Sequence, residues 1–330
     1  MSTAAPVTLI TVARAAGVSK TTASDALRRS GRVSEATRQL VAETAERLGY
    51  LPNRSAQSLR SASTATIGLH VPEIVTRSEY YMSFVFGVVE QATRQEYDVT
   101  LLTARRARGS ALRVDGVVLG DPLASDPVVH SLMDASVPVV TCERFIGDAH
   151  AAGVVRSDHA ATLVQLLDDL HAAGARRPAL LASSALGDWG ASLQRAYREW
   201  CERARVPILL RELAFGSAPT ATTENVRALL TADPTLDALV CAPDGSAVAA
   251  LPVLRDAGRV VGLDVLLAAC VDSSPLQHTD PPITAIDLHP RDAGVECARL
   301  LFDILAGRAE PGTVREVPIE LRPRASTRRG

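Results

Sequence analysis

Long apolar segments are missing from this chain of 330 residues, although 47% of its residues are hydrophobic. The best candidate, residues 260–271, contains Asp264 and is shorter than the roughly 18 apolar residues of a membrane-spanning helix. The N-terminal residues also lack the basic and apolar regions of a secretory signal. We therefore expect a globular protein that acts in the cytoplasm.

Cysteine is scarce and its spacing is uninformative. The five cysteines form an odd set without a C-x-x-C pair, which argues against a disulfide framework and against a structural zinc site. No other metal site is indicated. We expect reduced cysteines that pack in the core, at Cys142, Cys201, Cys241, Cys270 and Cys297.

Signatures of catalysis are missing too. The sequence has no G-x-S-x-G, no H-E-x-x-H and no G-x-G-x-x-G motif. The segment G-V-S-K-T-T contains Lys20 but lacks the glycine that precedes the lysine of a Walker A motif. We therefore predict that the chain is not an enzyme and needs no cofactor.

Charge is distributed unevenly along the chain. Residues 1–61 contain nine Lys or Arg and four Asp or Glu, a net charge of +5, while the remaining residues carry −7, giving −2 for the whole chain. A small basic module on a larger acidic one is typical of a protein whose first part binds phosphate groups. On charge alone, a solvated basic face without a partner would also fit.

The basic segment has the pattern of two short helices joined by a glycine turn. The first helix begins after Thr8, a suitable N-cap, and must end at Gly17; Ser19 can cap a second helix that runs to about Arg29. This is the helix-turn-helix unit, whose second helix enters the major groove of DNA. The predicted inward-facing residues are Leu9, Val12, Ala13, Ala16, Ala23 and Leu27.

A third helix follows the helix-turn-helix unit. It should begin at Ser34, carry Glu35 in its first turn and end at Gly49, before Pro52. The residues that we expect it to bury are Leu40, Val41, Ala45 and Leu48.

Three linked blocks, T-L-I-T-V-A-R-A-A-G-V-S-K-T-T-A-S-D-A-L, R-V-S-E-A-T-R and L-G-Y-L-P-N-R-S-A-Q-S-L-R, resemble the DNA-binding headpiece of the lactose repressor (LacI) family. The resemblance implies that Lys20 and Thr21 face base edges, with Asp25 one turn further on. It also implies phosphate contacts from short hydroxyl, phenol and amide groups, at Thr8, Ser19, Thr22, Ser24, Ser34, Thr37, Tyr50 and Asn53. Helix capping is the alternative role for several of these, and Ser19 and Ser34 can serve in both.

Residues 53–60 resemble the hinge of that family, which becomes helical on DNA and inserts a leucine into the minor groove. Leu59 stands at that place, and Arg54 and Ala56 belong to the same DNA-contacting segment. A hinge this short is not stable alone in water, so we expect its folding to be coupled to DNA binding. Packing of Leu59 on the core is the alternative.

Two headpiece positions depart from the family pattern. The family commonly has arginine where this chain has Asp25, and a carboxylate could accept from cytosine N4 or pair with Arg28 or Arg29. The family also usually has aspartate where Thr11 stands. The operator sequence therefore does not follow from the resemblance.

After a small polar linker, apolar runs alternate with helical stretches. This predicts parallel sheets with helices on both faces. We expect a small all-α headpiece at 1–52 and a hinge and linker at 53–66. For residues 67–330 the family resemblance implies an α/β core of two doubly wound, periplasmic-binding-protein-like subdomains joined by three crossing strands. The predicted strands are residues 67–71, 98–102, 116–119, 137–141, 154–155, 179–182, 208–210, 238–241, 265–271 and 283–286.

The family resemblance also implies a ligand cleft between the two subdomains. Matching positions give Asp158, Asp244 and Asp272 as candidates for bonding the hydroxyl groups of a sugar. The slot of the family's cleft arginine is occupied by Leu193, with Arg195 nearby on another helical face. The aromatic residues Tyr80, Tyr81, Phe84 and Trp189 could form an apolar wall.

The segment of 11 residues from Thr103 to Arg113 replaces a full helix of the family. Together with the lost arginine, this leaves three interpretations: an unusual ligand, a different cleft, or a regulator with a degenerate cleft. We predict a homodimeric DNA-binding regulator of the nucleoid, a repressor, which binds a pseudo-palindromic operator and responds to a small molecule.

Overall fold

The computed structural model describes residues 7–27, 30–50, 63–72, 78–103, 112–214 and 217–329. The chain divides into two compact units, Met1–Thr64 and Ala65–Gly330. Every helix in the described part of the chain is too short or too polar to span a membrane.

The first unit contains three helices, α1 (Leu9–Ala15), α2 (Lys20–Leu27) and α3 (Glu35–Arg47). Its core is built mainly from alanine and valine, which let the three short helices approach closely. Gly17 has a φ of +69° in the turn between α1 and α2, which confirms the predicted glycine turn. The prediction that Leu40 is buried is wrong: its side chain is 48% exposed, because the inner face of α3 is formed by Val41, Thr44 and Ala45.

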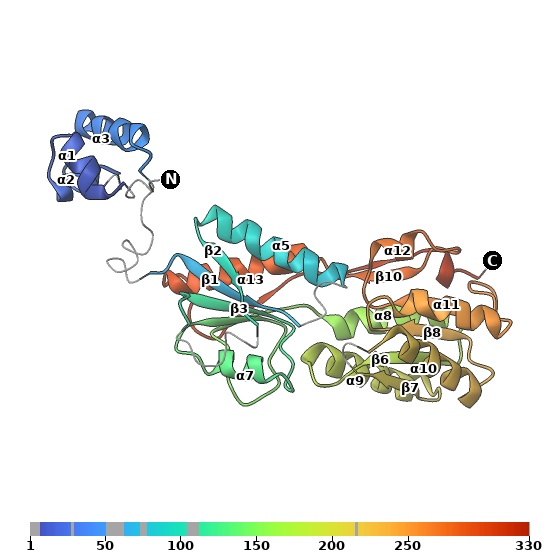
Figure 1. Ribbon diagram of the computed structural model, residues 1–330. Helices are drawn as coiled ribbons and strands as arrows, with labels where there is room; N and C mark the ends of the chain where they lie inside the picture. The colour runs from blue at the N-terminus through green and yellow to red at the C-terminus, as the bar shows by residue number, and fades with distance from the viewer. Residues whose placement is uncertain are drawn as a thin grey trace. The chain divides into compact units, whose positions relative to one another are not determined.

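The second unit begins with a sheet of six parallel strands in the order β11-β5-β4-β3-β1-β2. The strands are β1 (Thr66–His70), β2 (Asp98–Leu101), β3 (Gly116–Gly120), β4 (Val139–Cys142), β5 (Gly153–Arg156) and β11 (Thr313–Glu316). Helices α5 (Glu79–Arg94) and α13 (Pro290–Leu305) cover one face, and α7 (Pro127–Met133) covers the other (Figure 1). Val118 of β3 enters the core under α5 and α13, whereas Val117 and Leu119 enter the core under α7.

A second sheet has the order β12-β10-β9-β8-β6-β7, and only β12 runs antiparallel. Its strands are β6 (Pro178–Ser183), β7 (Leu209–Leu213), β8 (Ala238–Cys241), β9 (Leu266–Ala269), β10 (Thr284–Asp287) and β12 (Glu320–Arg322). The α-helices around it are α8 (His159–Ala172), α9 (Asp188–Ala204), α10 (Pro219–Ala232), α11 (Ser246–Asp256) and α12 (Ser274–Gln277). Alternate residues of β6 face opposite sides, with Leu180 and Ala182 in one core and Ala179 and Leu181 in the other.

All ten predicted strands overlap observed ones, and β11 and β12 are additional. These two short strands complete the sheets: the chain passes between the subdomains after β5, after β10 and between β11 and β12, which confirms the three predicted crossings. The five cysteines are buried and free, as predicted. The unusual segment 103–113 falls largely outside the described residues.

Candidate functional site

Hydroxyl side chains cap the helices of the first unit in a repeated pattern. Each helix is preceded by a Ser or Thr whose oxygen accepts a hydrogen bond from the backbone N–H three residues later. The N···O distances are 3.3 Å for Thr11 to Thr8, 3.0 Å for Thr22 to Ser19 and 3.3 Å for Thr37 to Ser34. In each pair the two side-chain oxygens also hydrogen bond to each other. The predicted capping roles of Thr8, Ser19 and Ser34 are confirmed.

The predicted base-reading residues Lys20 and Thr21 are both exposed in the first turn of α2. Backbone N–H groups at a helix N-terminus carry partial positive charge, so this position suits a contact with DNA phosphates and base edges. Lys20 is also the only lysine of the whole sequence. Asp25 is half-buried further along α2, and its side chain lies close to Gly31.

The other predicted DNA contacts occupy different environments. Thr22 and Thr37 are half-buried, as is Tyr50, which packs against the small headpiece core. Ser24 is only 8% exposed and faces inward, because α2 turns this side toward the other helices. The remaining candidates of the hinge, Asn53, Arg54, Ala56 and Leu59, lie outside the described residues.

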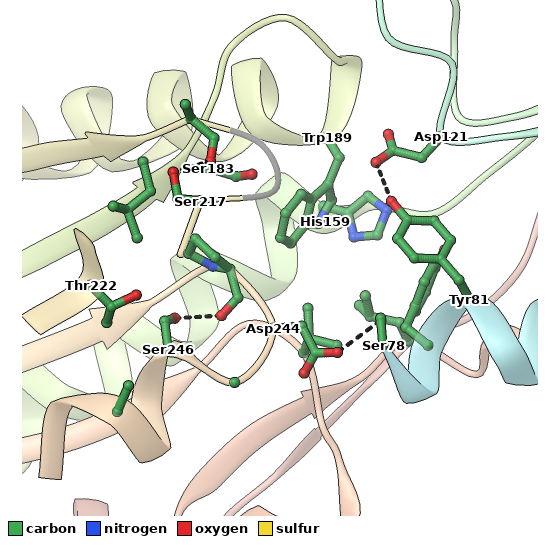
Figure 2. Close-up of a pocket in the computed structure, with 18 of the residues that line it drawn as sticks. Ser78, Tyr81, Asp121, His159, Ser183, Trp189, Ser217, Thr222, Asp244 and Ser246 are labelled. Carbon is green, nitrogen blue, oxygen red and sulfur yellow. Dashed lines mark hydrogen bonds between the residues drawn. The ribbon is translucent and has the colours of Figure 1, made fainter. Parts of the chain in front are cut away.

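A pocket of about 360 Å³ opens between the two subdomains of the second unit. Residues of both sheets and of α5 meet there, as Figure 2 shows. Its polar and charged lining residues are Ser78, Asp121, Glu143, His159, Ser183, Ser217, Thr222, Asp244 and Ser246. Its aromatic wall is formed by Tyr80, Tyr81 and Trp189.

The carboxyl ends of three parallel strands supply the acidic groups of this pocket. Asp121 follows β3, Glu143 follows β4, and Asp244 follows β8. Ligands of open α/β sheets commonly bind at such strand ends. Asp121 and Glu143 adopt left-handed backbone conformations, with φ of 51° and 64°, which are uncommon for non-glycine residues and cost on the order of 1–3 kcal/mol each.

Each of these three carboxylates accepts a hydrogen bond from a neighbouring side chain. Tyr81 Oη donates to Asp121 Oδ2 at 2.9 Å, and His159 Nε2 donates to Glu143 Oε1 at the same distance. Ser78 Oγ donates to Asp244 Oδ2 at 2.8 Å.

The environment also shifts the acidity of these groups. The pKa of Asp121 is raised to about 6: burial is the main cause and the neighbouring Glu143 adds to it, while the hydrogen bond from Tyr81 acts in the opposite direction. Burial likewise raises the pKa of Asp244, while the Ser78 hydrogen bond lowers it. The negative charges of Asp121 and Asp244 are therefore less stable in the pocket than in water, because burial removes part of their hydration.

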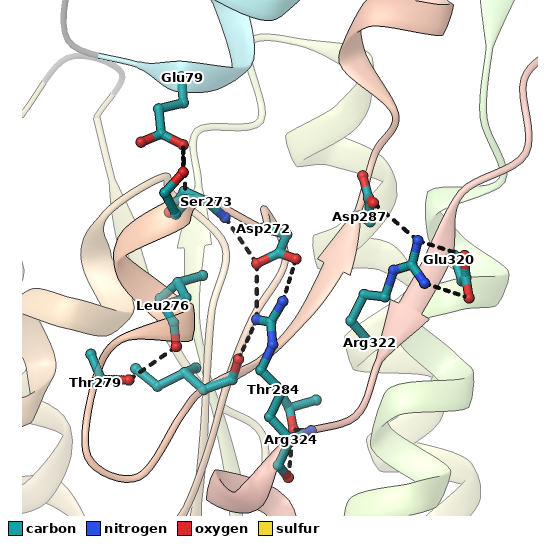
Figure 3. Close-up of polar contacts among 12 residues, drawn as sticks. Glu79, Asp272, Ser273, Leu276, Thr279, Thr284, Asp287, Glu320, Arg322 and Arg324 are labelled. Atoms are coloured by element: carbon teal, nitrogen blue, oxygen red, sulfur yellow. Dashed lines mark hydrogen bonds and ion pairs between the residues drawn. The ribbon is translucent and has the colours of Figure 1, made fainter.

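The N-terminus of α5 joins the two subdomains. Ser78 is the N-cap of α5, yet its hydroxyl donates to Asp244 of the other subdomain instead of capping its own helix. The next residue, Glu79, accepts hydrogen bonds from the backbone N–H and the hydroxyl of Ser274 at 2.9 and 3.0 Å (Figure 3). Both contacts require the two subdomains to lie close together.

The structure does not bring the four predicted ligand residues together, since only Asp244 lines the pocket. Asp158 caps α8 by accepting from Ala161 N at 2.9 Å, and it is exposed. Arg195 is exposed on α9, whose inner face carries Leu193 instead. Asp272 forms a bidentate ion pair with Arg324, with an Nη1–Oδ1 distance of 2.9 Å (Figure 3). We therefore remove Asp158, Arg195 and Asp272 from the candidate site.

The sequence analysis missed three charged or basic pocket residues, Asp121, Glu143 and His159. It also missed the hydroxyl residues Ser78, Ser183, Ser217, Thr222 and Ser246. The signal that could have found Asp121 and Glu143 is their position directly after buried strands. Of the predicted apolar wall, Tyr80, Tyr81 and Trp189 line the pocket, whereas Phe84 is fully buried in the core under α5.

The sequence matches two family models. The model described as bacterial regulatory proteins, lacI family, matches residues 8–53, and that of a periplasmic binding protein-like domain matches residues 167–327. The chain is 32% identical to the HTH-type transcriptional regulator CelR of Thermobifida fusca over 91% of its own length and 92% of that protein. The chain belongs to the lacI family. The maltose regulon regulatory protein MalI of Escherichia coli is 31% identical, with 90% of this chain and 92% of that protein covered.

Solved structures of lacI-family proteins have the same architecture. A CelR–cellobiose complex superposes with a TM-score of 0.74 at 30% identity, covering 97% of this chain and 99% of that one. The Lac repressor dimer bound to operator superposes with a TM-score of 0.83 at 22% identity, covering 98% and 100%. The predicted family and fold class are thereby confirmed.

Proposed function

We propose that this lacI-family regulator binds an operator through α2 and represses transcription, and that a small polar molecule in the pocket changes its operator affinity. The observation that carries the first part is the exposure of Lys20 and Thr21 in the first turn of α2, on a helix-turn-helix unit with a net charge of +5 over residues 1–61. The DNA contacts would come from Thr8, Ser19, Lys20, Thr21, Thr22, Asp25, Ser34, Thr37 and Tyr50, and from the hinge.

The pocket supports control by a ligand. Its volume of about 360 Å³ lies within the range of roughly 300–1,000 Å³ that is typical of small-molecule sites. If the core no longer bound a ligand, substitutions to larger side chains could fill this space without loss of function. The CelR structure that matches this chain over nearly its whole length contains cellobiose, which supports a sugar or a related metabolite as the effector.

The active form that we propose is a homodimer on a pseudo-palindromic operator. One headpiece contacts few base pairs, and two copies on paired half-sites roughly double the recognition free energy. Met82, Phe86 and Val89 form an apolar stripe along one face of α5 and are 38%, 56% and 38% exposed. A second copy would cover this stripe.

The remaining parts of the proposal concern organisation and location. We propose a headpiece at 1–52, a hinge and linker at 53–66 and a core at 67–330; the boundary between the two compact units, at Thr64 and Ala65, supports a core that begins near residue 67. In this proposal the chain works by binding rather than by catalysis, on the nucleoid in the cytoplasm.

A DNA-binding experiment with the full chain tests the proposal. Fragments from the upstream region of its own gene should be shifted at lower protein concentration than random DNA of the same length. Because the headpiece neutralises phosphates, affinity should fall steeply as the salt concentration rises. Equal binding to all fragments would contradict operator recognition, and binding that does not respond to salt would contradict the phosphate contacts.

A further inference from the structure

The pocket between the subdomains has an unusual balance of charge. Asp121, Glu143 and Asp244 line it, and His159 is the single basic side chain among the described residues that do so. Lysine and arginine are absent from the described part of its wall. A neutral sugar needs both donors and acceptors from its site, whereas this side of the pocket offers mainly acceptors.

Placing three carboxylates in a partly buried pocket raises the free energy of the protein unless a positive charge lies nearby. A carboxylate that loses water is stabilised only by donors or by a nearby cation. The protein supplies one side-chain donor to each group, from Tyr81, His159 and Ser78. Asp121 and Glu143 are in addition held in left-handed backbone conformations, a form of strain that collects at functional sites.

Aromatic side chains surround the same carboxylates. The rings of Tyr80 and Tyr81 meet edge to face with centroids 5.1 Å apart, and the rings of His159 and Trp189 with centroids 6.4 Å apart. Aromatic faces attract ammonium groups, and they do so more strongly in a site shielded from water. Carboxylates and aromatic rings both attract positive charge, so this part of the pocket suits an organic cation.

Other residues that line the pocket carry hydroxyl groups. These are Ser183, Ser217, Thr222 and Ser246, which come from the second subdomain, as Asp244 does. Trp189 Nε1 is also buried and has no hydrogen-bond partner among the described residues. A ligand oxygen would satisfy this donor, because buried polar groups in native proteins are nearly always paired. The second half of the ligand should therefore carry hydroxyl groups.

We propose that the pocket binds a hydroxylated amine, of the chemical class of an amino sugar, with the ammonium group held by Asp121, Glu143 and Asp244. This inference rests on the proposed function of the pocket as the effector site. It specifies the charge of the effector, which the resemblance to sugar-binding relatives does not.

Matched pairs of sugars and amino sugars test the inference on the full chain at about pH 7. The pairs are glucose and glucosamine, galactose and galactosamine, and cellobiose and its analogue built from two β-1,4-linked glucosamine units. In isothermal titration, at least one amino compound should bind about tenfold or more tightly than its parent, as expected for a charge-assisted contact. The N-acetylated form of that compound, which has the same ring but no charge, should lose the advantage.

Variants locate the effect in the pocket. Asp121→Asn and Asp244→Asn should each reduce the preference for the amine several-fold, while Asp148→Asn, at an exposed position outside the pocket, should leave it unchanged. Binding of a parent sugar as tight as that of its amine would overturn the inference but leave the proposed sugar-responsive regulator standing. Failure of every amine in the panel to bind would also overturn it. The proposed function is tested separately by the operator shift.

Discussion

Ser78 and Asp244 are 166 positions apart in the sequence, and the hydroxyl of one donates to the carboxylate of the other at 2.8 Å across the pocket. Ser78 stands at the N-terminus of a helix of the first subdomain, and Asp244 follows a strand of the second. This hydrogen bond joins the two subdomains at a carboxylate that lines the pocket.

Removing that bond should favour an open arrangement of the subdomains. Ser78→Ala leaves the half-buried Asp244 carboxylate without this donor, which should cost about 1–3 kcal/mol, whereas Ser78→Thr keeps the hydroxyl. Hydrogen–deuterium exchange should therefore become faster at the start of α5 and around Ser274 in Ser78→Ala alone. If both variants exchange like the wild type, the bond does not control closure.

Lys20 offers a direct test of the DNA interface, since it is the only lysine. Acetylation of the chain with an amine-specific reagent can modify only Lys20 and the N-terminal amine, and bound operator should protect Lys20. Lys20→Ala should cost on the order of 1–3 kcal/mol on the operator if the ammonium group contacts a base edge. Random DNA is the control, because equal losses on operator and random DNA would assign Lys20 to a phosphate contact.

Phe86 should be essential for dimerisation. Phe86→Asp places a charge in the centre of the apolar stripe of α5, so the molar mass from light scattering should fall from dimer to monomer. Operator affinity should fall by about a hundredfold or more, because one headpiece binds one half-site. Leu263→Asp changes an equally exposed apolar residue of the second subdomain and should have neither effect. A dimeric Phe86→Asp protein would show that another surface joins the two copies.

Asp121 should make the stability of the ligand-free protein depend on pH. Its pKa is raised to about 6 in the folded chain, above its usual value near 4, so the folded state binds this proton more tightly than the unfolded state does. The free energy of unfolding should therefore decrease as the pH rises from about 4 to about 6. Other carboxylates titrate in the same window, so the comparison needs a variant.

Asp121→Asn isolates the contribution of that group. At about pH 7 the variant should be more stable than the wild type by on the order of 1–3 kcal/mol, and the difference should vanish near pH 4. Thermal melting at several pH values measures it. A variant that is less stable at neutral pH would mean that the hydrogen bond from Tyr81 outweighs the cost of burying the charge.

Local sequence determined the headpiece and the strands of this protein. The helix caps at Thr8, Ser19 and Ser34 and the glycine turn at Gly17 depend on residues within a few positions of one another, so their patterns are visible in the sequence. The exception, Leu40, is exposed because Val41, Thr44 and Ala45 form the inner face of α3. Buried parallel strands were likewise visible as apolar runs.

Tertiary structure alone decided the pocket. Asp158, Asp244 and Asp272 are equivalent as sequence signals, but Asp158 caps a helix, Asp244 lines the pocket and Asp272 pairs with Arg324, a residue 52 positions away. Asp121 follows β3, Glu143 follows β4, and His159 is the first residue of α8. These three residues come together only because the ends of the two strands and the start of the helix meet at the pocket. The charge and shape of a binding site depend on such long-range proximity, which residue patterns along the chain do not encode locally.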